Sequence, residues 1–215
     1  RRNRITIPPQ SSAFSLKIQK FRYESYCARG LWMMQNGNGK MAGNGYDYDY
    51  FFSPSRGRRG FLDAIGDIVE FVNEDQISFY EIGVGTDSEE KLEANGKAGK
   101  SDFVSVITVH RIGKHGRFFW KRACDVSTFD RHDRILKEAY YSLDLAQRII
   151  AEFRARLQQH LYDFEIHLDI GNNGPTKNMI QEIVGMITGN GFTAKIKPDS
   201  YAANKVADRH VIGKA

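Results

Sequence analysis

Two aspartates stand in parts of the chain where a lone carboxylate is unusual. Asp87 ends the run EIGVGTD, and Asp169 lies within IHLDIG. Both runs have the apolar, glycine-containing composition of buried strands, whose interiors disfavour Asp. Two carboxylates brought side by side there would repel by several kcal/mol at an intermediate effective dielectric. Such a pair implies either a raised carboxyl pKa or a bound cation.

Three further carboxylates are candidate partners of this pair. Glu138 flanks the apolar stripe of a long predicted helix, Asp199 follows a predicted strand in KPDS, and Asp208 lies in the predicted last helix. Several carboxylates can hold two Mg²⁺ or Mn²⁺ ions about 4 Å apart, for phosphodiester cleavage. Each also has a simpler interpretation. Glu138 can be a solvated helix residue, Asp199 a helix N-cap, and Asp208 an ion-pair partner of Lys205 or Arg209.

The elements that must position these carboxylates follow from hydrophobic periodicity. Strands are predicted at 78–88, 103–112, 117–126, 164–171 and 192–198, and helices at 60–75, 130–161, 176–191 and 201–211. From residue 78 the order is β-β-β-α-β-α-β-α. This order predicts an α/β fold whose mixed sheet has three antiparallel strands plus two parallel strands, with helices on both faces. The first and fourth strands are neighbours in it, which places Asp87 beside Asp169.

The chain of 215 residues divides into two regions of different composition. The stretch QNGNGKMAGNGYDYDYFF is rich in Gly, Asn and Tyr and has neither helical nor strand periodicity, while SLKIQKFRYESYCARGLWMM before it fits a short strand or a helix. We interpret residues 1–50 as an amino-terminal arm, flexible or loosely packed. This arm is a candidate surface for a second copy of the chain or another protein. We assign residues 51–215 to one ribonuclease-H-like domain, because their element order matches that fold.

Composition excludes some classes of protein. No apolar run approaches the roughly 20 residues that cross a bilayer, so we expect no membrane partner. Cys27 and Cys124 lack the spacing of a zinc site and the density of a disulfide scaffold. We therefore expect a cytoplasmic protein.

Basic residues suggest a phosphate-rich partner. The formal net charge is +5, and the run HRIGKHGRFFWKR interleaves cations with aromatic rings, a pattern that suits nucleic-acid binding. The same alternation fits an amphipathic hairpin with buried rings and solvated charges. The candidate nucleic-acid contacts are Lys114, Arg117, Trp120 and Lys121 in this hairpin, and Lys195 and Lys197 in the last strand.

Four runs of the sequence resemble the YkuK-type ribonuclease-H-like family of predicted nucleases. They are FSPSRGRRGFLDAIGDIVEFV, YEIGVGTDS, HLDIGNNGPTKNMIQEIVGMITGNGF and KIKPDSYAANKVADRH, and the likeness covers about residues 51–210. The resemblance implies a ribonuclease H fold and a metal-dependent nuclease, with acidic positions of the wider superfamily at Asp87, Glu138, Asp169 and Asp208. Where ribonuclease H enzymes often have a histidine that assists product release, this chain has Asp199. That residue is then a candidate fifth metal-side carboxylate, and His210 a candidate substitute for the histidine.

These patterns support two main hypotheses about the function. The first is a nuclease that uses two Mg²⁺ or Mn²⁺ ions to cleave RNA, an RNA–DNA hybrid or structured DNA. The second is a nucleic-acid-binding module whose ribonuclease-H-like site is weak or inactive. A nucleotide-handling protein of the actin-like kinase type is disfavoured, because no second phosphate loop accompanies the Asp-containing turn.

Overall fold

The computed structural model describes residues 50–92, 98–157, 162–171, 179–201 and 206–207. Their elements are β1 (Tyr50–Ser53), β2 (Gly57–Gly60), α1 (Phe61–Asn73), β3 (Tyr80–Leu92), β4 (Ala98–Arg111), β5 (Gly116–Ser127), α2 (Arg131–Arg156), β6 (Tyr162–His167), α3 (Ile180–Gly189) and β7 (Thr193–Lys195). Residues 1–49 of the predicted arm, most of the predicted last helix, and with it Asp208 and His210, lie outside the described residues.

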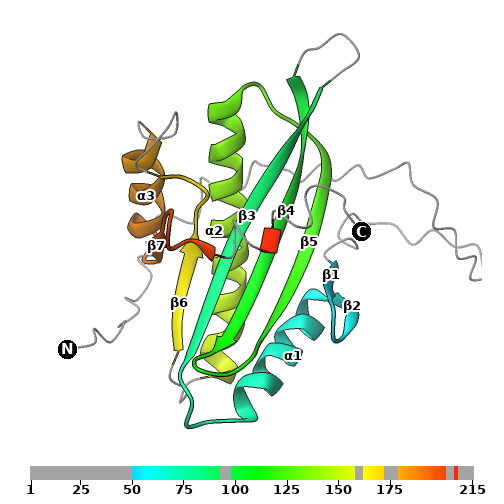
Figure 1. Ribbon diagram of the computed structural model, residues 1–215, viewed down its shortest axis with the longest axis vertical. Coiled ribbons are helices and arrows are strands. Elements are labelled where there is room, and N and C mark those ends of the chain that lie inside the picture. Colours follow the sequence, from blue (N-terminus) through cyan, green and yellow to red (C-terminus); the bar gives the residue numbers. More distant parts are fainter. Residues whose placement is uncertain (1–49, 93–97, 158–161, 172–178, 202–205, 208–215) are drawn as a thin grey trace, which may run out of the picture.

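The strands form one mixed sheet in the order β2-β1-β5-β4-β3-β6-β7 (Figure 1). Strands β3, β4 and β5 are antiparallel neighbours, β6 runs parallel to β3, and β7 runs parallel to β6. The predicted ribonuclease-H-like mixed sheet is confirmed, and β3 and β6 are neighbours as expected. The sheet is wider than predicted, because β1 and β2 extend its β5 edge.

One face of the sheet carries the main core. The helices α1, α2 and α3 all bury apolar side chains in it, including Ile68, Ile149 and Ile183, against Ile82 and Val84 of β3. Figure 1 shows α2 running along the long strands. This helix begins where the Asp130 carboxylate accepts a hydrogen bond from the backbone N–H of Asp133 at 2.8 Å as its N-cap, close to the predicted start at residue 130. None of the helices in the described part of the chain is long and apolar enough to cross a membrane.

The opposite face of the sheet is more polar and carries a smaller apolar cluster. Val104 and Val106 of β4 pack there with Val206 and Ala207, beside partly buried Phe118 and Trp120. The Tyr201 ring meets the buried His167 ring edge-on at 4.6 Å between centroids. Residues of the segment predicted as the last helix therefore cover part of this face, which we call the second face.

The strands β1 and β2 were not predicted. GRRG contains no residue type that favours strands, so its composition gave no sign of β2. The turn between the two strands uses Gly57 at φ +69°, a left-handed conformation that suits glycine. Phe51 is fully buried in the main core, and the Phe52 ring stacks on that of Trp120. Packing on β5, rather than local propensity, therefore holds this hairpin in the sheet.

Candidate active site

The register of β3 and β6 brings Asp87 and Asp169 to equivalent positions. The last pair between the two parallel strands is Gly85 with His167, and each aspartate follows two residues later. Asp87 pairs across β4 with Val104, which belongs to the second face. Because side chains two residues apart on a strand share a face, both aspartates belong to the second face. The predicted neighbourhood of the two strands is therefore confirmed.

Asp87 is half-buried, and the backbone N–H of Ser88 donates to its Oδ1 at 2.8 Å. This hydrogen bond ties the Asp87 carboxylate to the backbone of its own strand.

Glu138 approaches the same strand from the main-core side. Its carboxyl group is buried and accepts a hydrogen bond from the Ser88 hydroxyl, and Arg134 Nη1 lies 3.7 Å from its Oε1. The pKa of Glu138 is raised to about 8, mainly by burial and also by the charges of Asp87 and Asp169, while the hydrogen bond from Ser88 and the charge of Arg134 oppose the rise. Since Ser88 and Asp87 alternate along β3, Glu138 and Asp87 lie on opposite faces of the strand. Glu138 therefore keeps its proton at neutral pH, and it lies near enough for the charges of both aspartates to act on it while it contacts β3 from the other face.

Sequence reasoning missed Ser88 and Arg134 as partners of Glu138. Arg134 donates to both the carbonyl and the hydroxyl oxygen of Ser88, each at 3.0 Å. Two features of the sequence pointed to these contacts. Arg134 and Glu138 are four residues apart on the predicted helix, and Ser88 directly follows Asp87. Both became informative only once α2 had been placed on β3.

Lys197 lies at the carboxylate pair. Its Nζ is 2.9 Å from Asp169 Oδ1. The angles of this contact are not those of a hydrogen bond, and among the described residues the buried Oδ1 has no hydrogen-bond partner. Lys195, the other lysine predicted to contact phosphate, lies 3.4 Å from Glu165. Each lysine thus neutralises a carboxylate, and Lys197 does so within the candidate site.

The predicted nucleic-acid contacts of the β4–β5 hairpin do not share one surface. Lys114 and Arg117 pair with Asp75 and Glu74 after α1, at 2.6 and 2.9 Å. Lys121 lies over the Phe51 ring on the main-core side. Trp120 belongs to the second face. The hairpin is amphipathic, and within this set it is Trp120 that shares the face of Asp87.

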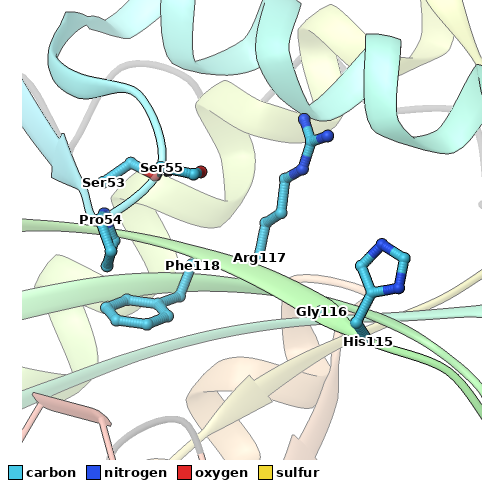
Figure 2. Close-up of a pocket in the computed structure, with 7 residues that line it drawn as sticks. All are labelled: Ser53, Pro54, Ser55, His115, Gly116, Arg117 and Phe118. Carbon is cyan, nitrogen blue, oxygen red and sulfur yellow. Dashed lines mark hydrogen bonds between the residues drawn. The ribbon is translucent and has the colours of Figure 1, made fainter.

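A shallow pocket of about 270 Å³ lies away from the carboxylates (Figure 2). Figure 2 shows Arg117 extending toward a helix while Phe118 points to the other side of β5. Val109, the partner of Arg117, is five residues from Val104, so the pocket lies about 17 Å along the sheet from Asp87. Its lining residues are Ser53, Pro54, Ser55, His115, Gly116, Arg117 and Phe118. Because no carboxylate lines the pocket, we do not assign the catalytic chemistry to it.

The two aspartates fit a divalent cation. Asp169 Oδ1 is a buried oxygen with no hydrogen-bond partner in the described part of the chain, and Asp87 offers a second hard ligand nearby. Mg²⁺ is commonly held by one or two carboxylates together with water and substrate phosphates. Within the described residues no group of three or more His, Cys, Asp or Glu side chains is arranged to hold a metal ion. Asp199 is exposed, and within the described part of the chain no hydrogen bond or ion pair joins it to Asp87 or Asp169. The described residues therefore offer two candidate ligands, Asp87 and Asp169.

Comparisons with known proteins agree with this architecture. The family described as Ribonuclease H-like matches residues 63–211. A protein of Bacillus subtilis (strain 168), named "Uncharacterized protein YkuK", is 33% identical over 176 residues, which cover 74% of this chain and 95% of that protein. No solved structure gives a significant match.

Proposed function

Since this chain belongs to the YkuK-type ribonuclease-H-like family, we propose that it is a metal-dependent nuclease that cleaves phosphodiester bonds. Membership of this family supports a nuclease-like or nucleic-acid-binding role. The observation that carries the finer proposal is the pairing of Gly85 with His167 on neighbouring parallel strands, because Asp87 and Asp169 each follow that pair by two residues. RNA, an RNA–DNA hybrid and structured DNA are the candidate substrates.

Asp87 and Asp169 are the proposed ligands of a Mg²⁺ or Mn²⁺ ion. When bound, such an ion neutralises phosphate charge and lowers the pKa of a coordinated water. The protein's own part is to hold two carboxylates at one strand end, on the more polar face of the sheet. Lys197 lies at the pair and supplies a positive charge that suits the phosphate of a substrate.

The two-ion form of the proposal needs more ligands than this pair. Glu138, Asp208 and Asp199 are the proposed additional carboxylates. Glu138 would have to lose its proton and reach past Ser88. Asp208 lies outside the described residues. The resemblance to the superfamily supports the two-ion mechanism that we propose, whereas the aspartate pair itself supports the binding of a single ion.

The test is cleavage of labelled RNA, hybrid and branched DNA with Mg²⁺ or Mn²⁺. We expect Asp87→Asn to abolish cleavage, because Asn keeps the shape of the side chain and removes the anionic ligand. Asp63→Asn, at an exposed position in the first turn of α1, is the matched control and should cleave like the wild type. If the wild type cleaves none of these substrates with either metal, the nuclease proposal is wrong.

A second candidate is a nucleic-acid-binding module with a weak or inactive site. It is favoured by the Lys197–Asp169 ion pair and the neutral Glu138, which together leave little negative charge to attract a cation. On this alternative, nucleic acid binds with a strong salt dependence. Binding is then unaffected by Asp87→Asn, and no cleavage accompanies it.

We also propose a cytoplasmic location and a role for residues 1–50 in homo-oligomers or in binding another protein. Size-exclusion chromatography with light scattering, on the full chain and on a variant that starts at residue 50, tests the second proposal. Equal oligomeric states for the two would count against it.

A further inference from the structure

An aromatic and basic patch occupies the β1–β2 edge of the second face. We call the set Tyr50, Phe52, Arg58 and Trp120 the edge platform. Phe52 is directly opposite both Arg58 of β2 and Trp120 of β5, so these three side chains share one face. The Phe52 and Trp120 rings stack with centroids 5.1 Å apart, and the Arg58 guanidinium lies 3.8 Å from the Tyr50 ring centroid.

The rings of the edge platform are only partly covered. Phe52 is 42% exposed, and Tyr50 and Trp120 are half-buried. In this respect Phe52 differs from Phe51, its neighbour on the strand, which points into the main core and is fully buried. An exposed ring that already stacks on a second ring offers a flat surface for a planar ligand group.

The charge of the edge platform is positive and is not offset locally. Arg56 and Arg59 of the same hairpin pair with Glu70 and Asp67 of α1, at 2.9 Å in each case. Arg58 is exposed, and within the described residues no carboxylate pairs with it. A guanidinium held near the exposed Phe52 ring suits a ligand that carries both phosphates and planar bases.

We propose that the edge platform binds a single strand of nucleic acid, with a base on the exposed ring of Phe52 and a phosphate at Arg58. A duplex fits less well, because its base faces are stacked within the helix and closed to the rings. The proposal takes from the proposed function that the partner is nucleic acid, but it does not require cleavage.

The edge platform lies close enough to the aspartates to serve the same strand. Asp87 is opposite Val104, and Val104 is opposite Arg122, two residues from Trp120. Strand spacing then puts the backbones of Trp120 and Asp87 about 12 Å apart. Val206 and Ala207 pack on β4 in the same region. A bound strand would therefore pass beside this segment.

Binding in EDTA separates this proposal from cleavage. The full chain is titrated into a fluorescein-labelled 12-nucleotide single strand, of DNA or RNA, and into the matching duplex, with anisotropy as the readout. We expect Phe52→Ala to weaken single-strand binding by at least about fivefold, the lower end of the effect of losing one stacked base. We expect Arg58→Ala to lower the salt dependence of binding. Phe129→Ala and Arg154→Ala, at exposed positions outside the edge platform, should bind like the wild type.

A second readout follows Trp120 directly. The chain has two tryptophans, so Trp32→Phe leaves the fluorescence of Trp120 alone. We expect a saturable quench of that fluorescence when the single strand is added, with the midpoint given by the anisotropy titration.

Three results would overturn the proposal. The first is wild-type affinity in Phe52→Ala with an unchanged Trp120 signal. The second is duplex binding as tight as single-strand binding. The third is a change in oligomeric mass in Phe52→Ala without a change in affinity, which would assign the edge platform to a protein partner. Loss of cleavage in Asp87→Asn with retained, Phe52-dependent binding supports both proposals, whereas binding without any cleavage by the wild type refutes the nuclease proposal alone.

Discussion

Replacing Glu138 with Gln should change how the stability of the protein depends on pH. The pKa of Glu138 is raised from 4.5 to about 8, mainly by burial. In this range the folded state keeps a proton that the unfolded state has released. Stability from this group is therefore unaffected below about pH 4.5, falls as pH rises toward 8, and reaches its lowest value above 8.

The size of the effect on stability follows from the same shift in the pKa of Glu138. A pKa difference between 4.5 and about 8 corresponds to about 5 kcal/mol at full deprotonation, and to about 3 kcal/mol at pH 7. Gln has no proton to lose, and its amide oxygen can still accept the hydrogen bond from Ser88. The Glu138→Gln variant should therefore match the wild type near pH 5 and exceed it increasingly above that pH.

The assay is urea unfolding in EDTA at intervals from pH 5 to pH 9, followed by tryptophan fluorescence, with free energies obtained by linear extrapolation. Glu152→Gln is the control, because Glu152 lies on the same helix and is partly exposed beside Arg156. Its profile should run parallel to that of the wild type. If the Glu138→Gln profile is also parallel to the wild type, Glu138 is ionised in the folded protein and the reasoning from burial is wrong.

Three further predictions concern the site and its support. Lys197→Met should tighten Mn²⁺ binding, by up to about fivefold in calorimetry, because it removes the cation beside Asp169; weaker binding would contradict this. Arg111→Ala should cost about 2–3 kcal/mol in urea unfolding, because this buried guanidinium donates to a carbonyl in the last turn of α1 and to a phenol; a loss below 1 kcal/mol would contradict it. Gly83→Ala should lower the free energy of unfolding by about 1–3 kcal/mol, since its Cβ would lie 2.8 Å from a threonine hydroxyl and 2.9 Å from an imidazole carbon. Gly66→Ala should raise it by up to about 1 kcal/mol, because a Cβ at this position in α1 meets open space. Thermal melts that rank the two variants in the opposite order would refute this packing.

The sequence predicted the part of the site that depends on strand order and period alone. Asp87 and Asp169 lie in runs with strong strand character, and the order of elements made those strands neighbours, so their juxtaposition followed. Glu138 was predicted to flank the apolar stripe of the long helix, and its burial in α2 agrees with a position beside that stripe. Its position on the other face of β3 depends on how α2 packs, which periodicity does not determine.

The sequence could not predict the contacts of polar residues that follow the ends of strands, because those contacts depend on the paths of loops. Lys197 follows β7, and its contact with Asp169 depends on the path of the loops beyond β6 and β7. The β1–β2 hairpin shows the same limit, because Phe51 and Phe52 find their partners in β5 and in the core rather than within the hairpin. In both cases the stabilising contact is distant in sequence, and local propensity carries no trace of it.

The charge problem posed by three neighbouring carboxylates is met in the protein by three different devices. Asp87 accepts a backbone hydrogen bond, Asp169 has Lys197 beside it, and Glu138 keeps its proton. The raised pKa expected from a crowded carboxylate pair therefore falls on Glu138, the buried member, since desolvation adds to repulsion there. A cation at the aspartates would compete with Lys197 for Asp169, and its field would favour release of the Glu138 proton. Metal affinity at this site should accordingly rise with pH and with removal of Lys197, and these two dependences distinguish a cation held by the aspartates from one bound elsewhere on the chain.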